Sequence, residues 1–364
     1  MKIKNIITYL EEVAPLYYQE SYDNSGLLLG NSELEVTSAL IALDCTESII
    51  EEAIQNKCNL IITHHPLIFS KLSKITGSDY IQRIIIKAIK HDIAIYAIHT
   101  NLDNIYHGVN HRISEKLGLV NTAILSPKDN LIMQLVVYCP KKYTKKIQKA
   151  LFDSGAGNIG NYNECSFISQ GIGTFQPLQE AQPKIGSIGE RYSGNEERIS
   201  VVFPKHLRFQ IIKAMERAHP YEEVAYQIHT IDNLNQHVGS GMIGELLQPV
   251  SATKFLQYVK KKMQATNIRY SNIVKKQIKK VAVCGGSGSF LIQEAKCLEA
   301  DIFITSDIKY HDFFLADNRI ILADIGHYES EQFTKELISD LLIKKFPKFA
   351  VLLSKIRTNP INYL

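Results

Sequence analysis

Two distant stretches of the chain, residues 41–63 and 281–305, follow the same pattern of apolar and polar positions. Each begins with a short apolar run, continues through a turn into a segment with apolar residues at helical spacing, and ends in a second apolar run closed by threonine. Short apolar strands that alternate with helices are typical of βαβ units with a mostly parallel sheet. Further strand and helix patterns follow at 79–98 and from 319 onward, so the pattern predicts two similar α/β lobes.

The segment between these lobes, residues 129–236, has a different pattern. The predicted elements are strands at 132–138, 164–169, 198–203 and 224–231 and helices at 144–152 and 205–218. This βαββαβ order is that of the ferredoxin-like split βαβ fold. A long connection rich in glycine and proline separates the second strand from the third. We therefore expect an α/β protein in which residues 1–128 and 237–364 form one two-lobed domain, with an inserted ferredoxin-like α+β domain at 129–236.

Composition restricts the class of protein without naming a function. At roughly 150 residues per domain, the 364 residues correspond to about two domains, and the 45% apolar and 21% charged content is that of a globular protein. No apolar run approaches the ~20 residues of a membrane span, and residues 1–14 have the pattern of an amphipathic helix rather than a signal peptide. The net charge of +4 argues against nucleic acid as a partner. Six scattered cysteines predict reduced thiols and a cytoplasmic location.

Two adjacent histidines, His64 and His65, directly follow the apolar run that ends at Thr63. The carboxyl ends of strands are where ligands bind in open α/β sheets. Adjacent residues of a strand point to opposite faces, so both histidines serve one site only where the strand is turning, and Pro66 favours such a departure. The pair could also bind two different metals, and a polar loop that happens to contain two histidines is the alternative.

Two further strand ends carry the same chemistry. His99 and Asp103 follow the strand near 93–98, and His327 and Glu331 are four residues apart where a helix is predicted to begin. Taken singly, Asp103 could cap a helix and the other pair could lie on the surface. Together, the three strand ends offer imidazole and carboxylate ligands, which suit Zn, Mn or Fe. Five protein ligands exceed what one catalytic Zn needs, whereas two metals that share a carboxylate would use all five.

These motifs resemble the Ngg-one-interacting-factor-three-like family, whose bacterial members are named GTP cyclohydrolase I type 2 homologues. The resemblance lies in residues 22–27, 64–66, 99–103 and 326–331, and in 155–157, 171–175 and 219–223 of the middle segment. Tyr22 and Ser25 depart from the family pattern, which usually has Trp and often a hydrophobic residue there. The middle segment is similar to the inserted domain of longer family members, itself similar to PII and CutA signalling-type folds.

The resemblance implies a dinuclear metal site, which carries over onto His64, His65, Asp103, His327 and Glu331. Glu331 or Asp103 would be the bridging carboxylate, and the two divalent ions per subunit would be Zn, or else Fe or Mn. The family also implies a toroidal homohexamer, with metal sites that face an internal cavity and inserted domains that cover its openings. Its name implies opening of the imidazole ring of GTP with release of formate. A two-metal phosphoesterase on nucleotides and a non-catalytic regulatory or metal-handling protein are the alternatives.

Other residues near the same strand ends are candidates for supporting roles. His99 and His311 are candidate general acids or partners of the ligands, with a structural histidine as the alternative. Three aspartates are candidates to orient ligands or substrate, with capping as the alternative: Asp23, Asp44 and Asp307. The glycine-rich stretch 283–289 favours a tight turn over a phosphate cradle, because it lacks a complete phosphate-binding motif. Residues 219–223 form either a structural turn or a second ligand site.

Overall fold

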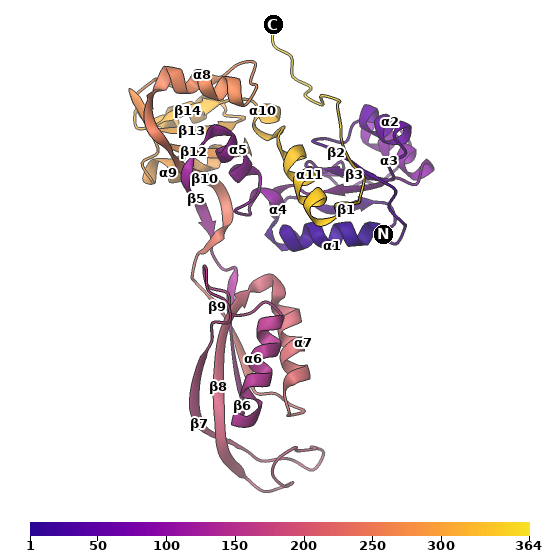
Figure 1. Cartoon of the computed structure of the whole chain (residues 1–364), viewed down its shortest axis with the longest axis vertical. Helices are drawn as coiled ribbons and strands as arrows, with labels where there is room; N and C mark the ends of the chain where they lie inside the picture. The colour runs from indigo at the N-terminus through magenta and orange to yellow at the C-terminus, as the bar shows by residue number, and fades with distance from the viewer. The chain divides into compact units, whose positions relative to one another are not determined.

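All 364 residues are described in the computed structural model, in which the chain folds as two compact units. The larger unit comprises Met1–Pro127 and Gln236–Leu364, and the smaller unit comprises Lys128–Asn235. The larger unit is built on two sheets and the smaller unit on one (Figure 1). A mixed α/β fold with several sheets is therefore confirmed. None of the helices combines the length and the apolar character that crossing a membrane requires.

The first sheet of the larger unit has the strand order β1-β4-β3-β2-β15. Its strands are β1 (Gly26–Leu29), β2 (Ala39–Ala42), β3 (Leu60–Thr63), β4 (Ala94–Ala97) and β15 (Val351–Leu353). Strand β1 is antiparallel to β4, and the other pairs are parallel. The helices of this lobe are α1 (Ile3–Val13), the 3₁₀ turn η1 (Leu16–Tyr18), α2 (Glu47–Gln55), α3 (Tyr80–Lys90) and α11 (Thr334–Lys345).

Local sequence explains why these elements form. The Thr46 side chain accepts a hydrogen bond from the Ile49 amide and caps α2, and Asp79 caps α3 in the same way through the Gln82 amide. Strands β2, β3 and β4 are buried at every position, which explains their continuous apolar sequence. The apolar faces of α2 and α3 pack with the sheet into one core, which includes Ile49, Ile50, Ala53, Ile61, Ile84, Ile85 and Ile95.

The second sheet has the order β11-β14-β13-β12-β10-β5. Its strands are β5 (Val120–Lys128), β10 (Asn235–Ser251), β11 (Arg269–Tyr270), β12 (Gln277–Ser287), β13 (Ile302–Ser306) and β14 (Ile321–Asp324). Strands β12, β13 and β14 are parallel, while β10 and β11 pair antiparallel with β12 and β14. The helices and 3₁₀ turns that accompany it are α4 (Thr100–Asp103), α5 (Val109–Leu117), α8 (Ala252–Lys262), η4 (Ser289–Leu291), α9 (Ile292–Cys297), η5 (Tyr310–Ala316) and α10 (His327–Glu331).

The smaller unit has one antiparallel sheet of order β7-β8-β6-β9. Its elements are β6 (Ile132–Pro140), η2 (Lys141–Tyr143), α6 (Thr144–Asp153), β7 (Phe167–Phe175), β8 (Tyr192–Pro204), η3 (Lys205–Leu207), α7 (Arg208–Ala218) and β9 (Tyr226–Ile231). Helices α6 and α7 lie on the same face of the sheet (Figure 1). Their apolar residues share a core with β6 and β8, which includes Leu135, Val137, Ile147, Leu151, Ile199, Ile211 and Met215.

The hairpin of β7 and β8 is longer than the sequence indicated. Residues 171–175 and 192–196, which the sequence analysis placed in a glycine- and proline-rich connection, pair with each other as the outer half of the hairpin. A Cβ on Gly173 would lie 2.2 Å from the Glu196 carboxylate, so this glycine leaves room for a large neighbouring side chain within a regular ladder. The connection that remains between the two strands is residues 176–191.

Candidate metal centre

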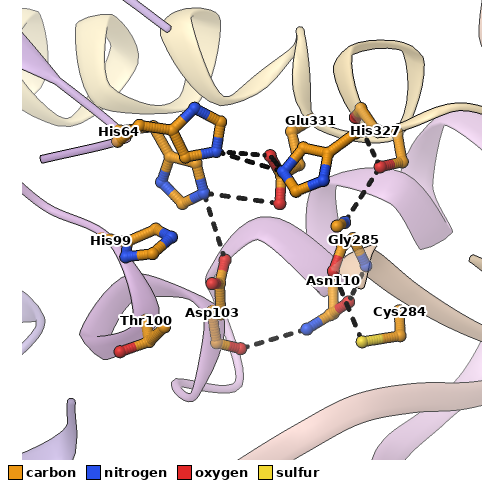
Figure 2. Close-up of polar contacts among 12 residues, drawn as sticks. His64, His99, Thr100, Asp103, Asn110, Cys284, Gly285, His327 and Glu331 are labelled. Atoms are coloured by element: carbon orange, nitrogen blue, oxygen red, sulfur yellow. Dashed lines mark hydrogen bonds and ion pairs between the residues drawn. The ribbon is translucent and has the colours of Figure 1, made fainter. Parts of the chain in front are cut away.

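The ends of three parallel strands meet at one point of the larger unit. His64 and His65 follow β3, α4 with Asp103 follows β4, and α10 with His327 and Glu331 follows β14. Figure 2 shows His64, Asp103 and His327 converging from the two lobes, with the Glu331 carboxylate among them. The structure thus brings together all five residues that the family resemblance singled out.

Two groups of three ligand-type side chains share Glu331. The first, here called the Asp103 group, consists of His64, Asp103 and Glu331; the second, the His327 group, consists of His65, His327 and Glu331. Within each group the ligand atoms lie within 4.8 Å of one another, so each group could hold a metal ion. Imidazole nitrogen and carboxylate oxygen together are donors that Zn, Fe and Mn accept.

The two carboxylate oxygens of Glu331 face different groups. Oε1 lies 3.7 Å from Nε2 of His64, which itself lies 3.6 Å from Oδ1 of Asp103. Oε2 lies 2.9 Å from Nε2 of His65 and 3.0 Å from Nε2 of His327. The two imidazoles of the His327 group are 3.3 Å apart through their Nε2 atoms. Glu331 thus contributes one carboxylate oxygen to each of these two groups, and it is almost fully buried. His64 and His65 also form a third group with His99, whose ligand atoms again lie within 4.8 Å of one another.

The chain turns directly after β3, which allows His64 and His65 to face the same centre. The Thr63 hydroxyl donates to the His65 carbonyl at 2.7 Å, and the His65 amide donates to the Leu43 carbonyl at 3.0 Å. The ring centroids of the two histidines are 5.0 Å apart. The strand thus ends at Thr63, and the chain bends at residues 64 and 65, directly before Pro66.

Each ligand histidine is held through its Nδ1 atom. His64 donates to the Ile98 carbonyl at 2.9 Å, His65 to Asp44 at 2.7 Å, and His327 to Asp307 at 2.5 Å. Such a partner fixes the tautomer and the ring orientation, and leaves Nε2 toward the centre. Asp44 and Asp307 thus each accept from the Nδ1 of a histidine of the candidate centre, in the position expected of a residue that orients a ligand.

The charges at this centre shift one another strongly. Burial disfavours the charged forms of His65 and His327, but the neighbouring carboxylates outweigh this effect. Glu331 and Asp44 raise the pKa of His65 to about 10, and Glu331 and Asp307 raise the pKa of His327 to about 11. Burial and the nearby Glu331 raise the pKa of Asp103 to about 8. Burial also opposes the charge of Glu331, yet the two imidazoles hold its pKa well below the usual value. Protons thus carry the positive charge that balances the buried carboxylates.

Two buried polar atoms of the Asp103 group have no hydrogen-bond partner: Nε2 of His64 and Oδ1 of Asp103. Buried polar atoms are normally paired, because burying one without a partner costs free energy. Both atoms are metal-ligand types that lie 3.6 Å apart, within 4.8 Å of a ligand oxygen of Glu331. The donor set therefore fits a divalent cation, which would give both atoms a partner.

The two histidines that the sequence named as candidate catalytic residues have different positions. His99 lies at the centre, where its ring is 5.2 Å from that of His64 and 5.3 Å from that of His65. Its Nδ1 donates to Asp23 at 2.8 Å, which leaves Nε2 free for other contacts. His311 lies in η5, where its ring contacts Tyr310 and Phe314, and it does not line the central cavity.

A cavity of about 520 Å³ opens onto the centre. Its wall includes ligands of both groups and four aromatic side chains from both lobes: Tyr22, Phe69, Phe290 and Tyr328. Tyr22 and Phe69 lie side by side, with ring centroids 6.3 Å apart. A cavity of this size and aromatic content is typical of a small-molecule site.

The glycine-rich stretch after β12 is a close-approach turn. Gly286 has a φ of +63°, and a Cβ there would lie 2.4 Å from Oε1 of Glu331. The Gly285 amide donates to Asn110 and the Gly286 amide donates to Ser330, each at 2.9 Å. These two amides are therefore engaged within the protein, and the turn lets Glu331 reach the Asp103 group.

Sequence reasoning missed the residues that brace this centre through single hydrogen bonds. Asn110, on α5, also donates to the Asp103 carbonyl at 3.1 Å, so it joins the glycine turn to α4. Thr358, close to the end of the chain, donates to Asp44. Single Asn and Thr residues carry no recognisable spacing, so no sequence signal pointed to them.

Named relatives match the chain over its full length. A Bacillus subtilis protein named "GTP cyclohydrolase 1 type 2 homolog" is 38% identical over 370 residues, covering 99% of this chain and 98% of the relative. A protein of the same name from Staphylococcus epidermidis is 35% identical and covers 100% of both chains.

Solved structures and a family profile give the same result. The crystal structure of a Bacillus cereus protein related to NIF3 superposes with a TM-score of 0.87 at 36% identity, covering 100% of this chain and 99% of that chain. A Staphylococcus aureus protein superposes with a TM-score of 0.80 at 30% identity and the same coverage. The profile of the Duf34/NIF3 (NGG1p interacting factor 3) family matches residues 1–360. The resemblance inferred from the motifs is confirmed, and the chain belongs to the Duf34/NIF3 family.

Proposed function

We propose that this protein is a dinuclear metal-dependent hydrolase in which the Asp103 group and the His327 group each hold one divalent cation. The observation that carries the proposal is the position of Glu331, whose two oxygens face different groups of ligand atoms. A carboxylate shared by two metals is a feature of many hydrolases. Of the two carboxylates that the sequence left as candidates for the bridge, this geometry favours Glu331 over Asp103.

Zinc is the metal that we propose first, with Fe or Mn as the other candidates, because the donors are imidazole and carboxylate. When bound, two such ions supply Lewis acidity that activates water and polarises the bond under attack. Asp44, Asp307 and the Ile98 carbonyl hold the ligand histidines in place for this chemistry.

Other residues of the cavity are suited to bind the substrate and to move a proton. Tyr22 and Phe69 present neighbouring aromatic rings, on which a planar heterocycle can stack. His99 is positioned through Nδ1 by Asp23, and we assign to its Nε2 the transfer of a proton to or from the substrate. The proposed catalytic role of His311 is dropped, because His311 lies outside the cavity.

The name of the relatives suggests the reaction: hydrolytic opening of the imidazole ring of GTP, with release of formate. An aromatic wall beside a water-activating centre suits attack at a ring carbon of a purine. For the phosphoesterase alternative the glycine-rich turn offers no phosphate cradle at Gly285 and Gly286, because both amides are already engaged within the protein. We also carry over from the family a cytoplasmic homohexamer. The smaller unit would be its PII- or CutA-like domain with a ferredoxin-like fold, as its strand order suggests.

The test has two steps on the full-length protein. Elemental analysis after purification without added metal should find about two divalent ions per chain, as a two-metal site requires. The loaded protein is then incubated with GTP, and formate and free phosphate are assayed separately. Formate with a ring-opened nucleotide supports the proposal, and phosphate release alone supports the phosphoesterase. Metal-loaded protein that leaves GTP unchanged would overturn the proposed reaction.

A Glu331→Gln variant is the negative control for this experiment, and Glu12→Gln is the matched control. Glu12 is an exposed residue of α1. Metal content and any turnover should be lost in the first variant and kept in the second. Size-exclusion chromatography with light scattering tests the hexamer, which should have six times the mass of the 41.2 kDa chain.

A further inference from the structure

The last eleven residues of the chain, here called the C-terminal segment (residues 354–364), form no helix or strand, yet side chains hold them in place. The segment leaves β15, whose strand pairs with β2 in the first lobe. Ser354 is buried, its amide donates to the Ile41 carbonyl at 2.8 Å, and its hydroxyl donates at 2.5 Å to Glu52 on α2. The start of the segment is thus fixed to the first lobe.

The next contact of this segment reaches the metal centre. The hydroxyl of Thr358 donates to Oδ2 of Asp44, whose Oδ1 accepts from Nδ1 of His65 at 2.7 Å. Each oxygen of the Asp44 carboxylate therefore has one partner, and the rotation of this carboxylate is fixed from both sides. A continuous path of hydrogen bonds leads from Thr358 through Asp44 to His65, whose Nε2 faces Glu331.

Beyond Thr358, the segment is anchored to the other lobe. Glu329, on the same short helix as His327 and Glu331, is buried, and its Oε1 accepts from Asn359 at 3.0 Å and from Arg357 at 3.4 Å. Asn359, Pro360 and Ile361 then line the cavity. The segment crosses between the lobes at the His327 group, and Thr358 is its one contact with the partner of a ligand histidine.

We propose that Thr358 is a positioning residue for the His327 group, which it serves by fixing the Asp44 carboxylate that orients His65. This inference rests on the proposed two-metal function. The C-terminal segment would then contribute to metal binding, in addition to lining the cavity. The Asp103 group takes its orientation from the Ile98 carbonyl and not from Thr358, so the effect is confined to one of the two groups.

The chemistry predicts a selective loss. Thr358→Val keeps the shape of the side chain and removes the hydroxyl, so Asp44 loses one of its two partners. Loss of an outer partner of a metal ligand lowers metal affinity by roughly 10- to 100-fold. We therefore expect the affinity of one of the two ions to fall by about 10-fold, because Thr358 acts through Asp44 and not on His65 directly. Thr358→Ser keeps the hydroxyl and should restore the affinity.

The experiment is a titration of the metal-free full-length protein with Co²⁺ in the presence of a competing chelator, followed by visible absorption. Wild type, Thr358→Val and Thr358→Ser are compared with two controls. Thr37 precedes β2, whereas Asp44 follows it, so the two residues lie at opposite ends of this strand. Thr37→Val removes a hydroxyl that donates to the Lys57 carbonyl. Arg357→Gln weakens the anchor on Glu329 but leaves Thr358 unchanged. Thermal melting of each metal-free variant measures stability separately from metal binding.

The expected result is two binding events in wild type, with one event weakened and its absorption bands altered only in Thr358→Val. Two wild-type-like events in Thr358→Val would overturn the inference while leaving the two-metal proposal intact. An equal loss in Arg357→Gln would also overturn it, because a general tethering of the segment would then explain the effect. A wild-type protein that binds no Co²⁺ would instead refute the proposed metal centre itself, and the inference with it.

Discussion

The Asp103 group and the His327 group share one carboxylate but differ in how their histidines are supported. In the Asp103 group, His64 is fully buried and donates to a backbone carbonyl. In the His327 group, both histidines donate to carboxylates, and both are partly exposed to the cavity. A carboxylate behind an imidazole raises its basicity as a ligand. If each group holds an ion as proposed, the two sites would be unequal. The histidine of the Asp103 group is buried and supported by a neutral carbonyl, whereas those of the His327 group are more exposed and supported by carboxylates.

Removal of Glu331, which the two groups share, should have the largest effect on metal binding, because it affects both groups at once. In Glu331→Ala both groups lose their common ligand, so we expect both ions to be lost and hydrolytic activity with them. Elemental analysis of the purified variant measures this directly, with Glu12→Ala as the control. Retention of one tightly bound ion by Glu331→Ala would show that the groups do not depend on a bridge.

Substitution of Asp307, which accepts from Nδ1 of His327, should lower the metal affinity of the His327 group alone. Asp307→Asn removes the carboxylate charge behind His327 and keeps the shape of the side chain. Metal affinity of the His327 group should fall by roughly 10- to 100-fold, as for other outer partners of metal ligands. Competitive Co²⁺ titration measures both affinities, and the affinity of the Asp103 group should remain unchanged. Equal weakening of both groups would contradict their separate support.

The pH dependence of metal binding should also differ between the groups. Without metal, His65 and His327 have pKa values raised to about 10 and 11, so both hold a proton at pH 7 that a metal must displace. The pKa of Asp103, raised to about 8, implies one displaced proton in its group. Affinity should rise with pH by about 10-fold per unit for each displaced proton, so the rise is steeper for the His327 group and continues to higher pH.

Calorimetry in buffers of different ionisation enthalpy counts these protons. The Asp103→Asn variant isolates the His327 group for the measurement, and Asp307→Asn should reduce the number of protons released. Metal binding that releases no protons between pH 6 and 8 would contradict the protonated state described above.

The five candidate ligands could be singled out from the sequence because each lies in the segment that follows a buried parallel strand, either directly after it or on the short helix beyond it. Such strands have a local apolar pattern, and the chemistry of the residue that follows is visible in the sequence itself. The same logic failed for His311, which also follows an apolar strand. Asp307 adopts a φ of +56° and directs its side chain to His327, after which the chain turns into η5 and away from the centre. No local pattern announces a left-handed residue of this kind.

Other parts of the fold depend on contacts that a sequence pattern does not contain. Strand β15 has three residues and gains its place by pairing with β2 from the opposite end of the chain. Strand β10 spans 17 residues with glycines inside it, and glycine weakens a strand, so its extent depends on the pairing with β12. Thr358 was missed for the same reason, because its hydrogen bond to Asp44 joins residues more than 300 positions apart.

The smallest effect should come from residues that brace the backbone of one group without touching a ligand side chain. Asn110 accepts from the Gly285 amide and donates to the Asp103 carbonyl, while Ser330 accepts from the Gly286 amide and donates to the His327 carbonyl. Asn110→Ala should therefore weaken only the Asp103 group, and Ser330→Ala only the His327 group, each by less than about 10-fold because no imidazole loses its partner. The same Co²⁺ titration resolves the two effects. If both variants weakened the same group, the turn at Gly285 and Gly286 would couple the two groups. The two groups would then form a single cooperative centre and would not be independent.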